Sequence, residues 1–182
     1  MAVLDIARMG AQVLRVSAQP VADPTAPEIA RLVADMKDTM AAAGGIGIAA
    51  PQVRVGLRVV IFGVPGERAE DGVGLPLTVL VNPDWHPLSD DKEEGYEGCL
   101  SVPGMTGLVP RYTRIAYRGY GLDGRLIERE AQGYHARVVQ HELDHLAGIL
   151  YPQRMTDLST LAFTEELRRE AAEVPVEALE AE

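Results

Sequence analysis

The stretch Gln140-His141-Glu142-Leu143-Asp144-His145 decides how the rest of the chain is organised. Residues four apart lie on one face of an α-helix, so His141 and His145 can present two imidazole nitrogens to a single cation. Glu142 then lies beside that cation without having to be a ligand. This H-E-x-x-H pattern is typical of sites in which two histidines bind a metal and the glutamate transfers protons.

The segments on either side of this stretch predict a hairpin followed by a helix. Gly133 precedes the helix and Gly148 follows it, and a glycine is a common residue just beyond a helix C-terminus. Residues 112–120 and 125–131 read as two strands, and Asp123-Gly124 between them supplies the positive φ angles that a tight turn needs. We therefore expect the histidine helix to follow directly after a β-hairpin.

The earlier part of the chain predicts one helix and two strands. The cluster 23–27 is a helix start signal, and apolar residues then recur at spacings of three and four until Gly44-Gly45. Residues 57–64 and 78–81 are β-branched and apolar, and Asn82-Pro83 is expected to end the second strand. The acidic residues 90–94 read as a solvated loop. A last helix is expected from residue 156 towards residue 172, followed by a frayed tail beyond Pro175.

Composition indicates one soluble globular domain. The chain has 182 residues, of which 47% are apolar and 24% are charged. Its net charge of −10 and the lack of a Lys/Arg cluster argue against nucleic-acid backbones and anionic membranes as partners. No basic leader and no apolar run of membrane-spanning length is present, so we expect a cytoplasmic protein. Cys99 is the only cysteine, which excludes an intramolecular disulfide.

Two histidines need at least one further ligand, and a chain with one cysteine favours a three-ligand site with an open position. A metzincin would carry a third histidine where Tyr151 stands, which largely excludes that class. Glu165 lies at a plausible separation for a thermolysin-like site, although its surroundings are acidic. Cys99 is a soft ligand beside a glycine, and a thiolate binds Fe²⁺ or Zn²⁺ readily. Both candidates remain open at this point.

Three segments in order resemble the signature motifs of one enzyme family, peptide deformylase. They are GIGIAAPQ (45–52), EGCLS (97–101) and QHELDH (140–145). The resemblance implies an α+β fold with mixed, mainly antiparallel sheets around a central helix carrying the HELDH motif. It covers residues 1–155 as a single catalytic domain, which leaves residues 156–182 as a C-terminal helix and acidic tail.

The resemblance also implies a metal site and a reaction. Cys99, His141 and His145 would be the metal ligands. The cofactor would be one divalent ion, physiologically Fe²⁺, with Zn²⁺, Ni²⁺ or Co²⁺ possible in a purified sample. The reaction implied is removal of the formyl group from the N-terminal formylmethionine of new polypeptides, with release of formate.

Catalytic and substrate-binding roles follow from the same resemblance. Glu142 would move the proton of the attacking water to the departing amine, and the Gln52 amide with the Leu100 backbone N–H would stabilise the oxyanion. The backbone of residues Gly45, Ile46 and Gly47 would pair with an extended peptide. The resemblance assigns the methionine pocket to Ile46, Tyr134 and Val138 with the ring of His141.

The chain departs from many bacterial deformylases after the EGCLS motif. Met105-Thr106-Gly107 stands where many members carry a peptide-binding arginine, and VPGMTGLVPR (102–111) looks closer to the subgroup that includes organellar deformylases. The expected partners are N-formylmethionyl nascent peptides and, transiently, the ribosome. The acidic C-terminal segment is unlike the basic helix that some relatives use for ribosome docking.

Two other functions compete with this interpretation. A zinc metallopeptidase with a His141, His145 and Glu165 site would make Cys99 dispensable. The other is an inactive metal- or peptide-binding protein descended from the enzyme. Such degenerate relatives often lose the glutamate or the ligand cysteine, whereas Cys99 and Glu142 are both present here.

Overall fold

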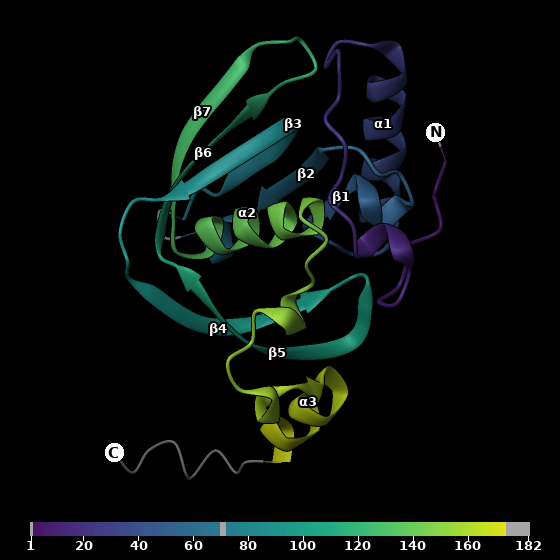
Figure 1. The fold of residues 1–182 in the computed structure, drawn as a ribbon. Helices are drawn as coiled ribbons and strands as arrows, with labels where there is room; N and C mark the ends of the chain where they lie inside the picture. Colours follow the sequence, from purple (N-terminus) through teal and green to yellow (C-terminus); the bar gives the residue numbers. More distant parts are fainter. Residues whose placement is uncertain (1, 70–71, 174–182) are drawn as a thin grey trace.

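Two antiparallel sheets enclose the helix that carries the HELDH motif (Figure 1). A computed structural model describes residues 2–69 and 72–173. Its helices are α1 (Pro27–Ala42), α2 (Gly133–Leu146) and α3 (Thr164–Glu173). The strands are β1 (Gly47–Ala49), β2 (Val59–Val64), β3 (Leu75–Pro87), β4 (Lys92–Cys99), β5 (Val102–Tyr112), β6 (Arg114–Tyr120), β7 (Leu126–Gln132) and β8 (Ala162–Phe163).

The larger sheet has the order β1-β2-β3-β6-β7, and the smaller one has the order β4-β5-β8. Every pairing between these strands is antiparallel, and a single parallel bridge joins Gln19 to Leu57. Helix α2 lies between the two sheets, while α1 and α3 lie at the periphery (Figure 1). This arrangement confirms the α+β fold with mainly antiparallel sheets around a central helix.

One face of helix α2 is apolar and packs on the larger sheet. Ala136, Val139 and Leu146 are fully buried and pack in one core cluster with Val60 and Phe62 of β2. Removing such side chains from water is the main force that holds the helix on the larger sheet. The remaining face is left for the smaller sheet, and it carries both histidines of the motif.

Helix α1 confirms the expected N-terminal helix. Pro27 occupies its first turn, where the missing N–H costs nothing, and the helix ends before Gly44, whose φ of +66° is in the left-handed region. Ile29, Val33 and Met36 form its buried stripe. They pack in a second core cluster with residues of β1 and β2, so α1 supports the edge of the larger sheet.

Strand β3 does not end at Asn82-Pro83, so that prediction was wrong. The strand continues to Pro87 through a register shift between Val81 and Asp84. Asn82 takes φ of +51°, and its side chain accepts a hydrogen bond from Val21 N–H and donates one to Val21 C=O, both at 2.8 Å. A β-bulge accommodates a proline that a regular central strand would exclude.

The prediction of a loop over the acidic segment 90–94 was wrong for residues 92–94. Residues 92–94 begin β4 and their side chains are exposed. Strand β4 is an edge of the smaller sheet, and charged side chains on an edge strand discourage pairing with other chains. The run of carboxylates therefore marks an edge strand.

The last helix begins later than expected. Asp157 caps only a short 3-10 turn, since its carboxylate accepts from the N–H of Ser159 at 2.8 Å. Strand β8 then pairs with β5, and α3 begins at Thr164. The segment after residue 155 thus contributes to the smaller sheet. The expected frayed tail lies outside the described residues. No helix in the described ranges has the length and apolar composition needed to cross a bilayer.

Candidate metal centre

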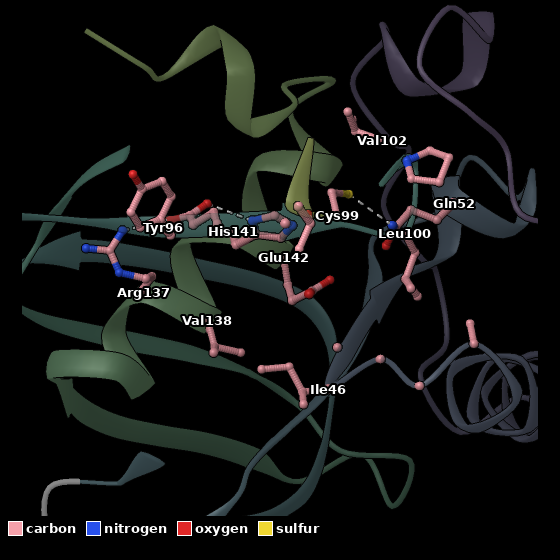
Figure 2. Close-up of a pocket in the computed structure, with 18 of the residues that line it drawn as sticks. Ile46, Gln52, Tyr96, Cys99, Leu100, Val102, Arg137, Val138, His141 and Glu142 are labelled. Atoms are coloured by element: carbon pink, nitrogen blue, oxygen red, sulfur yellow. Dashed lines mark hydrogen bonds and ion pairs between the residues drawn. The ribbon is translucent and has the colours of Figure 1, made fainter. Parts of the chain in front are cut away.

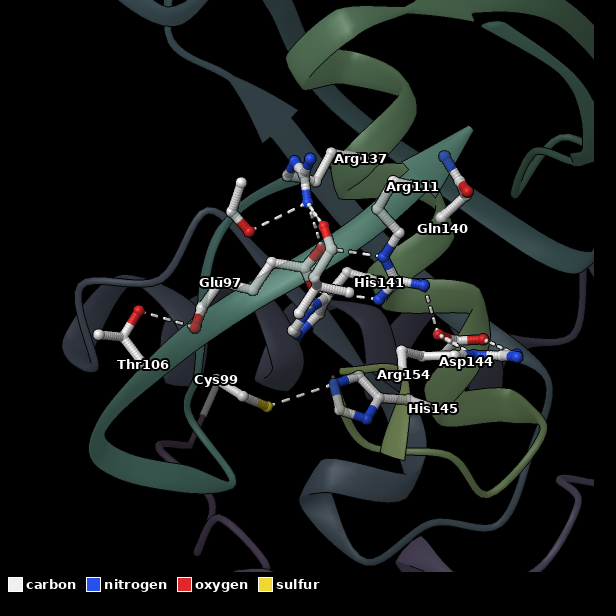
Figure 3. A network of polar contacts seen from close by, with 12 residues as sticks. Glu97, Cys99, Thr106, Arg111, Arg137, Gln140, His141, Asp144, His145 and Arg154 are labelled. Carbon is white, nitrogen blue, oxygen red and sulfur yellow. Dashed lines mark hydrogen bonds and ion pairs between the residues drawn. The ribbon is translucent and has the colours of Figure 1, made fainter. Parts of the chain in front are cut away.

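The structure brings together Cys99 from the end of β4 and both histidines of α2 (Figure 3). One ligand atom from each of these residues lies within 4.8 Å of the others, and Cys99 Sγ is 3.4 Å from His145 Nε2. Within residues 2–69 and 72–173 this is the one group of three or more such side chains that could hold a metal ion. Glu165, the alternative third ligand, is exposed on α3 and does not belong to the group.

His141 is oriented by Glu97. Its Nδ1 lies 2.8 Å from Glu97 Oε2, and an ionised carboxylate can only accept, so Nδ1 carries the hydrogen. The Nε2 lone pair is then free to bind a cation. A carboxylate behind a ligating imidazole fixes its ring orientation and increases its basicity as a ligand.

Glu97 is held by two arginines as well as by His141. Arg111 binds it through two hydrogen bonds of 2.9 and 3.0 Å, and Arg137 Nη1 donates to Oε1 at 3.0 Å (Figure 3). Burial raises the pKa of Glu97, but hydrogen bonds from His141 and Arg111 together with their charges lower it to about 2. Glu97 is therefore an ionised, immobilised acceptor beneath His141.

The ion pairs continue to the end of α2. Asp144, next to His145, accepts from Arg111 Nη1 at 2.6 Å and from Arg154 Nη2 at 2.7 Å. Arg111 and Asp144 are nearly fully buried, and a buried carboxylate without such partners would be strongly destabilising. Arg111 thus links β5 to β4 through Glu97 and to α2 through Asp144, and it fixes the spacing between Cys99 and the histidines.

The two histidines of the ligand group differ in their affinity for a proton. Burial lowers the pKa of His141, but hydrogen bonds with Cys99 and Glu97 raise it well above its usual value. His145 shows the opposite behaviour, since burial and the charges of His141 and Arg111 lower its pKa. Two imidazoles and one thiol at this distance favour a borderline divalent cation, and one cation would satisfy all three. The donor set therefore fits the metal that the motif predicts.

Glu142 lies beside the ligand group with a carboxylate oxygen that has no protein partner. Its Oε2 is buried and makes no hydrogen bond within the described residues. Burial raises the pKa of Glu142 to about 7, with the charge of His141 lowering it and that of Glu97 raising it. The carboxylate packs against Gly47 of β1, where a Cβ atom would overlap it. A general base requires a free carboxylate of this kind.

Gln52 has a fixed amide orientation. Its Oε1 accepts from Ala49 N–H at 2.8 Å, so the amino end points towards the ligand group. Nε2 lies 3.2 Å from Ser101 Oγ and 3.6 Å from Cys99 Sγ. Because the side chain is only 1% exposed, it is a preorganised donor just after β1.

A cavity of about 800 Å³ extends from this centre along α2 (Figure 2). Gly45, Ile46, Leu100, Tyr134 and Val138 line it, together with Glu142 and His141. Figure 2 shows Ile46, Val138 and Glu142 around one hollow and Arg137 at the opposite end from Gln52. The residues that the sequence assigned to substrate binding therefore border one cavity.

Strand β1 gives this cavity an open edge. It pairs with β2 on one side and is the terminal strand of the larger sheet, and Gly47 lines the cavity. A terminal strand presents unpaired backbone groups to an extended peptide.

Several site residues had no assigned role in the sequence. Glu97 and Asp144 lie inside two of the motifs, and the signal that could have identified them is a carboxylate two residues before Cys99 and one before His145. Arg111 gave no local signal, because only the pairing of β4 with β5 places it near Glu97. Arg137 gave none either, because it reaches Glu97 from α2.

Comparison with known proteins agrees with this geometry. Residues 3–160 match the family model described as polypeptide deformylase. Peptide deformylase 2 of Ralstonia nicotianae is 56% identical over 162 residues, which are 88% of this chain and 91% of the relative. A Met-Ala-Ser-bound crystal structure of class I type b peptide deformylase from Acinetobacter baumannii is 38% identical, with a TM-score of 0.78 over 85% of this chain and 99% of that one. The actinonin complex of peptide deformylase from Ehrlichia chaffeensis is 31% identical, with a TM-score of 0.80 over 96% of this chain and all of that one (100%). The chain therefore belongs to the polypeptide deformylase family.

Proposed function

We propose that this protein removes the formyl group from the N-terminal formylmethionine of new polypeptides and releases formate. The observation that carries the proposal is the group formed by Cys99, His141 and His145 next to the free carboxylate of Glu142. Family membership and the peptide-sized cavity support it.

Cys99, His141 and His145 would hold one divalent cation. Bound there, it would supply Lewis acidity for the formyl carbonyl and for the attacking water. One thiolate and two imidazoles suit Fe²⁺ and Zn²⁺ alike. We propose Fe²⁺ as the physiological ion on the family resemblance, and Zn²⁺, Ni²⁺ or Co²⁺ as substitutes in purified protein. Glu97 would keep His141 in the tautomer that leaves Nε2 free.

Glu142 would be the proton carrier. Its free Oε2 would accept a proton from the attacking water and later deliver it to the amine nitrogen of methionine. Expulsion of the amine requires that proton, since an amide anion is a poor leaving group. The position of Glu142 against Gly47 would keep the carboxylate next to a peptide bound along β1.

Gln52 and Leu100 would stabilise negative charge on the formyl oxygen. The Gln52 amide already points its amino group towards Cys99, and Leu100 borders the same cavity. We assign donation to the Gln52 side chain and to the backbone N–H of Leu100. Loss of one donor of this kind typically lowers kcat by about 10² to 10³.

The peptide would bind as an extra strand beside β1. Gly45, Ile46 and Gly47 would supply the backbone contacts, and the methionine side chain would enter the pocket at Ile46, Tyr134 and Val138. Backbone pairing recognises few side chains, so tolerance beyond the first residue follows. Substrates of this kind arise on ribosomes, and we therefore propose a cytoplasmic location with transient ribosome association.

Product identity tests the proposal. Metal-loaded protein is incubated with formyl-Met-Ala-Ser, and the products are separated and identified by mass spectrometry. We expect formate and intact Met-Ala-Ser. Cleavage between methionine and alanine, with the formyl group retained, would instead support a metallopeptidase, and in that case a Cys99→Ala variant would keep its metal.

A further inference from the structure

The cavity beside the metal centre has a neighbour at the start of α2. This second cavity, of about 330 Å³, lies between the first residues of α2, parts of β4 and β5 and the 67–69 segment. Glu67, Arg68, Tyr134 and Arg137 line both cavities. These residues therefore form the boundary between the two spaces.

Arg68 and Tyr134 meet across this boundary. Arg68 Nη1 donates to the hydroxyl of Tyr134 at 2.7 Å, and the guanidinium carbon lies 5.4 Å from the centre of the tyrosine ring. The two residues come from the β2–β3 connection and from the first turn of α2. We call this contact the Arg68–Tyr134 partition.

Arg137 is a fixed part of the same wall. It donates to the backbone carbonyls of Glu93, Gly95 and Val109 and to the carboxylate of Glu97. Arg68, in contrast, is exposed, and among the described residues its side chain makes one hydrogen bond, to Tyr134. Removing the Arg68 side chain would therefore open the boundary without disturbing the ion pairs around Glu97.

The partition lies on the path of a side chain that extends from the metal centre. Tyr134, Val138 and His141 follow one another along the same face of α2. At 1.5 Å per residue, Tyr134 is about 10 Å along the helix axis from His141. A side chain that starts beside His141 first passes Val138, and a longer one then reaches Tyr134 and Arg68.

We propose that the Arg68–Tyr134 partition sets the longest first side chain that the enzyme accepts. This inference rests on the proposed function, because it places the first residue of a formylated peptide in the larger cavity. An unbranched side chain of methionine length ends before the partition. A side chain two atoms longer meets it, and the space that such a chain needs lies in the second cavity.

The test is a comparison of formylated tripeptides that differ in their first residue. Formate release is measured from formyl-Met-Ala-Ser and from the analogue with 2-aminooctanoic acid in place of methionine. The proteins are metal-loaded wild type, Arg68→Ala, Tyr134→Phe and the double variant. Arg114→Ala is the matched control. Arg114 is exposed, as Arg68 is, but it pairs with the carboxylate of Glu130 and borders neither cavity.

We expect wild type to prefer methionine and Arg68→Ala to reduce that preference by about tenfold, through a lower KM for the long analogue. Tyr134→Phe should reduce it less, because the ring remains. Arg114→Ala should keep the wild-type ratio. A ratio within twofold of wild type in both Arg68→Ala and the double variant would overturn the partition while leaving the deformylase function in place. Wild type without activity on formyl-Met-Ala-Ser would contradict the function and the partition together.

Discussion

At the scale of single residues, Gly47 leaves the space that the carboxylate of Glu142 occupies. A Cβ atom at position 47 would overlap the carboxylate of Glu142. The glutamate side chain is flexible enough to move away, so the fold tolerates the change, but the proton carrier would be displaced. A misplacement of this kind can lower a rate by about 10².

We therefore predict that Gly47→Ala lowers kcat by about 10² with little change in melting temperature. Steady-state formate release and thermal unfolding would be measured on the same preparation. Gly56→Ala is the control, since a Cβ at position 56 has open space around it. A Gly47→Ala enzyme with wild-type kcat would show that Glu142 does not need its place against β1.

Glu97 controls a metal ligand without being one. Its carboxylate accepts from His141 Nδ1 at 2.8 Å and is ionised, with a pKa of about 2. We predict that Glu97→Gln weakens metal affinity by about 10- to 100-fold, because the amide is a weaker acceptor for the imidazole.

Competition against a chelator of known affinity measures this effect. Glu93→Gln, an exposed carboxylate on the same strand, should keep the wild-type affinity. Equal affinities for wild type and Glu97→Gln would mean that the hydrogen bond to His141 does not tune the site.

At the scale of elements, the end of α2 lies close to the N-terminal arm, residues 2–26, which precede α1. Gly148 has φ of +74°, and a Cβ there would lie 2.7 Å from the carbonyl carbon of Arg15. Gly44 shares the conformation, with φ of +66°, but has no atom within 4 Å of such a Cβ. Substituting each glycine by alanine therefore distinguishes the cost of backbone strain, which both positions share, from the cost of steric overlap, which only position 148 has.

We predict that Gly44→Ala lowers the free energy of unfolding by about 1 kcal/mol and Gly148→Ala by about 3 kcal/mol. The smaller loss is the cost of a left-handed backbone for alanine. The larger one adds displacement of the arm from α2. Denaturant unfolding of both variants tests the difference. Equal decreases in the free energy of unfolding would mean that the arm moves away from Gly148 at no measurable cost.

The elements that could be predicted from the sequence are those with a local signal. The helix α1 has a proline start, an apolar stripe and a glycine end, and the β6–β7 hairpin has its Asp-Gly turn. The elements that were misjudged depend on long-range pairing. Asn82 continues β3 because its side chain binds Val21, and β8 exists because it pairs with β5.

The candidate site likewise contains residues that a local motif identifies and residues that only the fold brings together. Cys99, His141, His145 and Glu142 lie in short motifs whose residue types state their chemistry. Their spatial proximity could be inferred only through the family resemblance, since Cys99 lies on β4 and the histidines on α2. Arg111 was missed because its function depends on Glu97 and Asp144, which lie on two different elements.

At the scale of the whole molecule, the ligand group joins the smaller sheet to the central helix. Cys99 and the two histidines are 42 or more positions apart in sequence, from 99 to 141, so the unfolded chain holds no such site. A ligand that binds only the folded state stabilises it, by about 4 kcal/mol at a thousand times its Kd.

Metal removal should therefore lower the melting temperature, and added Fe²⁺ or Zn²⁺ should restore it. Calorimetry with and without chelator measures the change. Cys99→Ala should lose most of the chelator effect, because it lacks one of three ligands. Identical melting temperatures for loaded and chelated wild type would contradict a cation shared between the sheet and the helix.

The central claim is that a metal group and Glu142 together perform deformylation. The most direct measurement is formate release from formyl-Met-Ala-Ser by iron-loaded wild type and Glu142→Gln, with metal content determined on each sample. We predict rapid release by wild type and a metal-loaded Glu142→Gln variant slower by at least about 10². A Glu142→Gln variant that carries metal and releases formate at the wild-type rate would contradict the account.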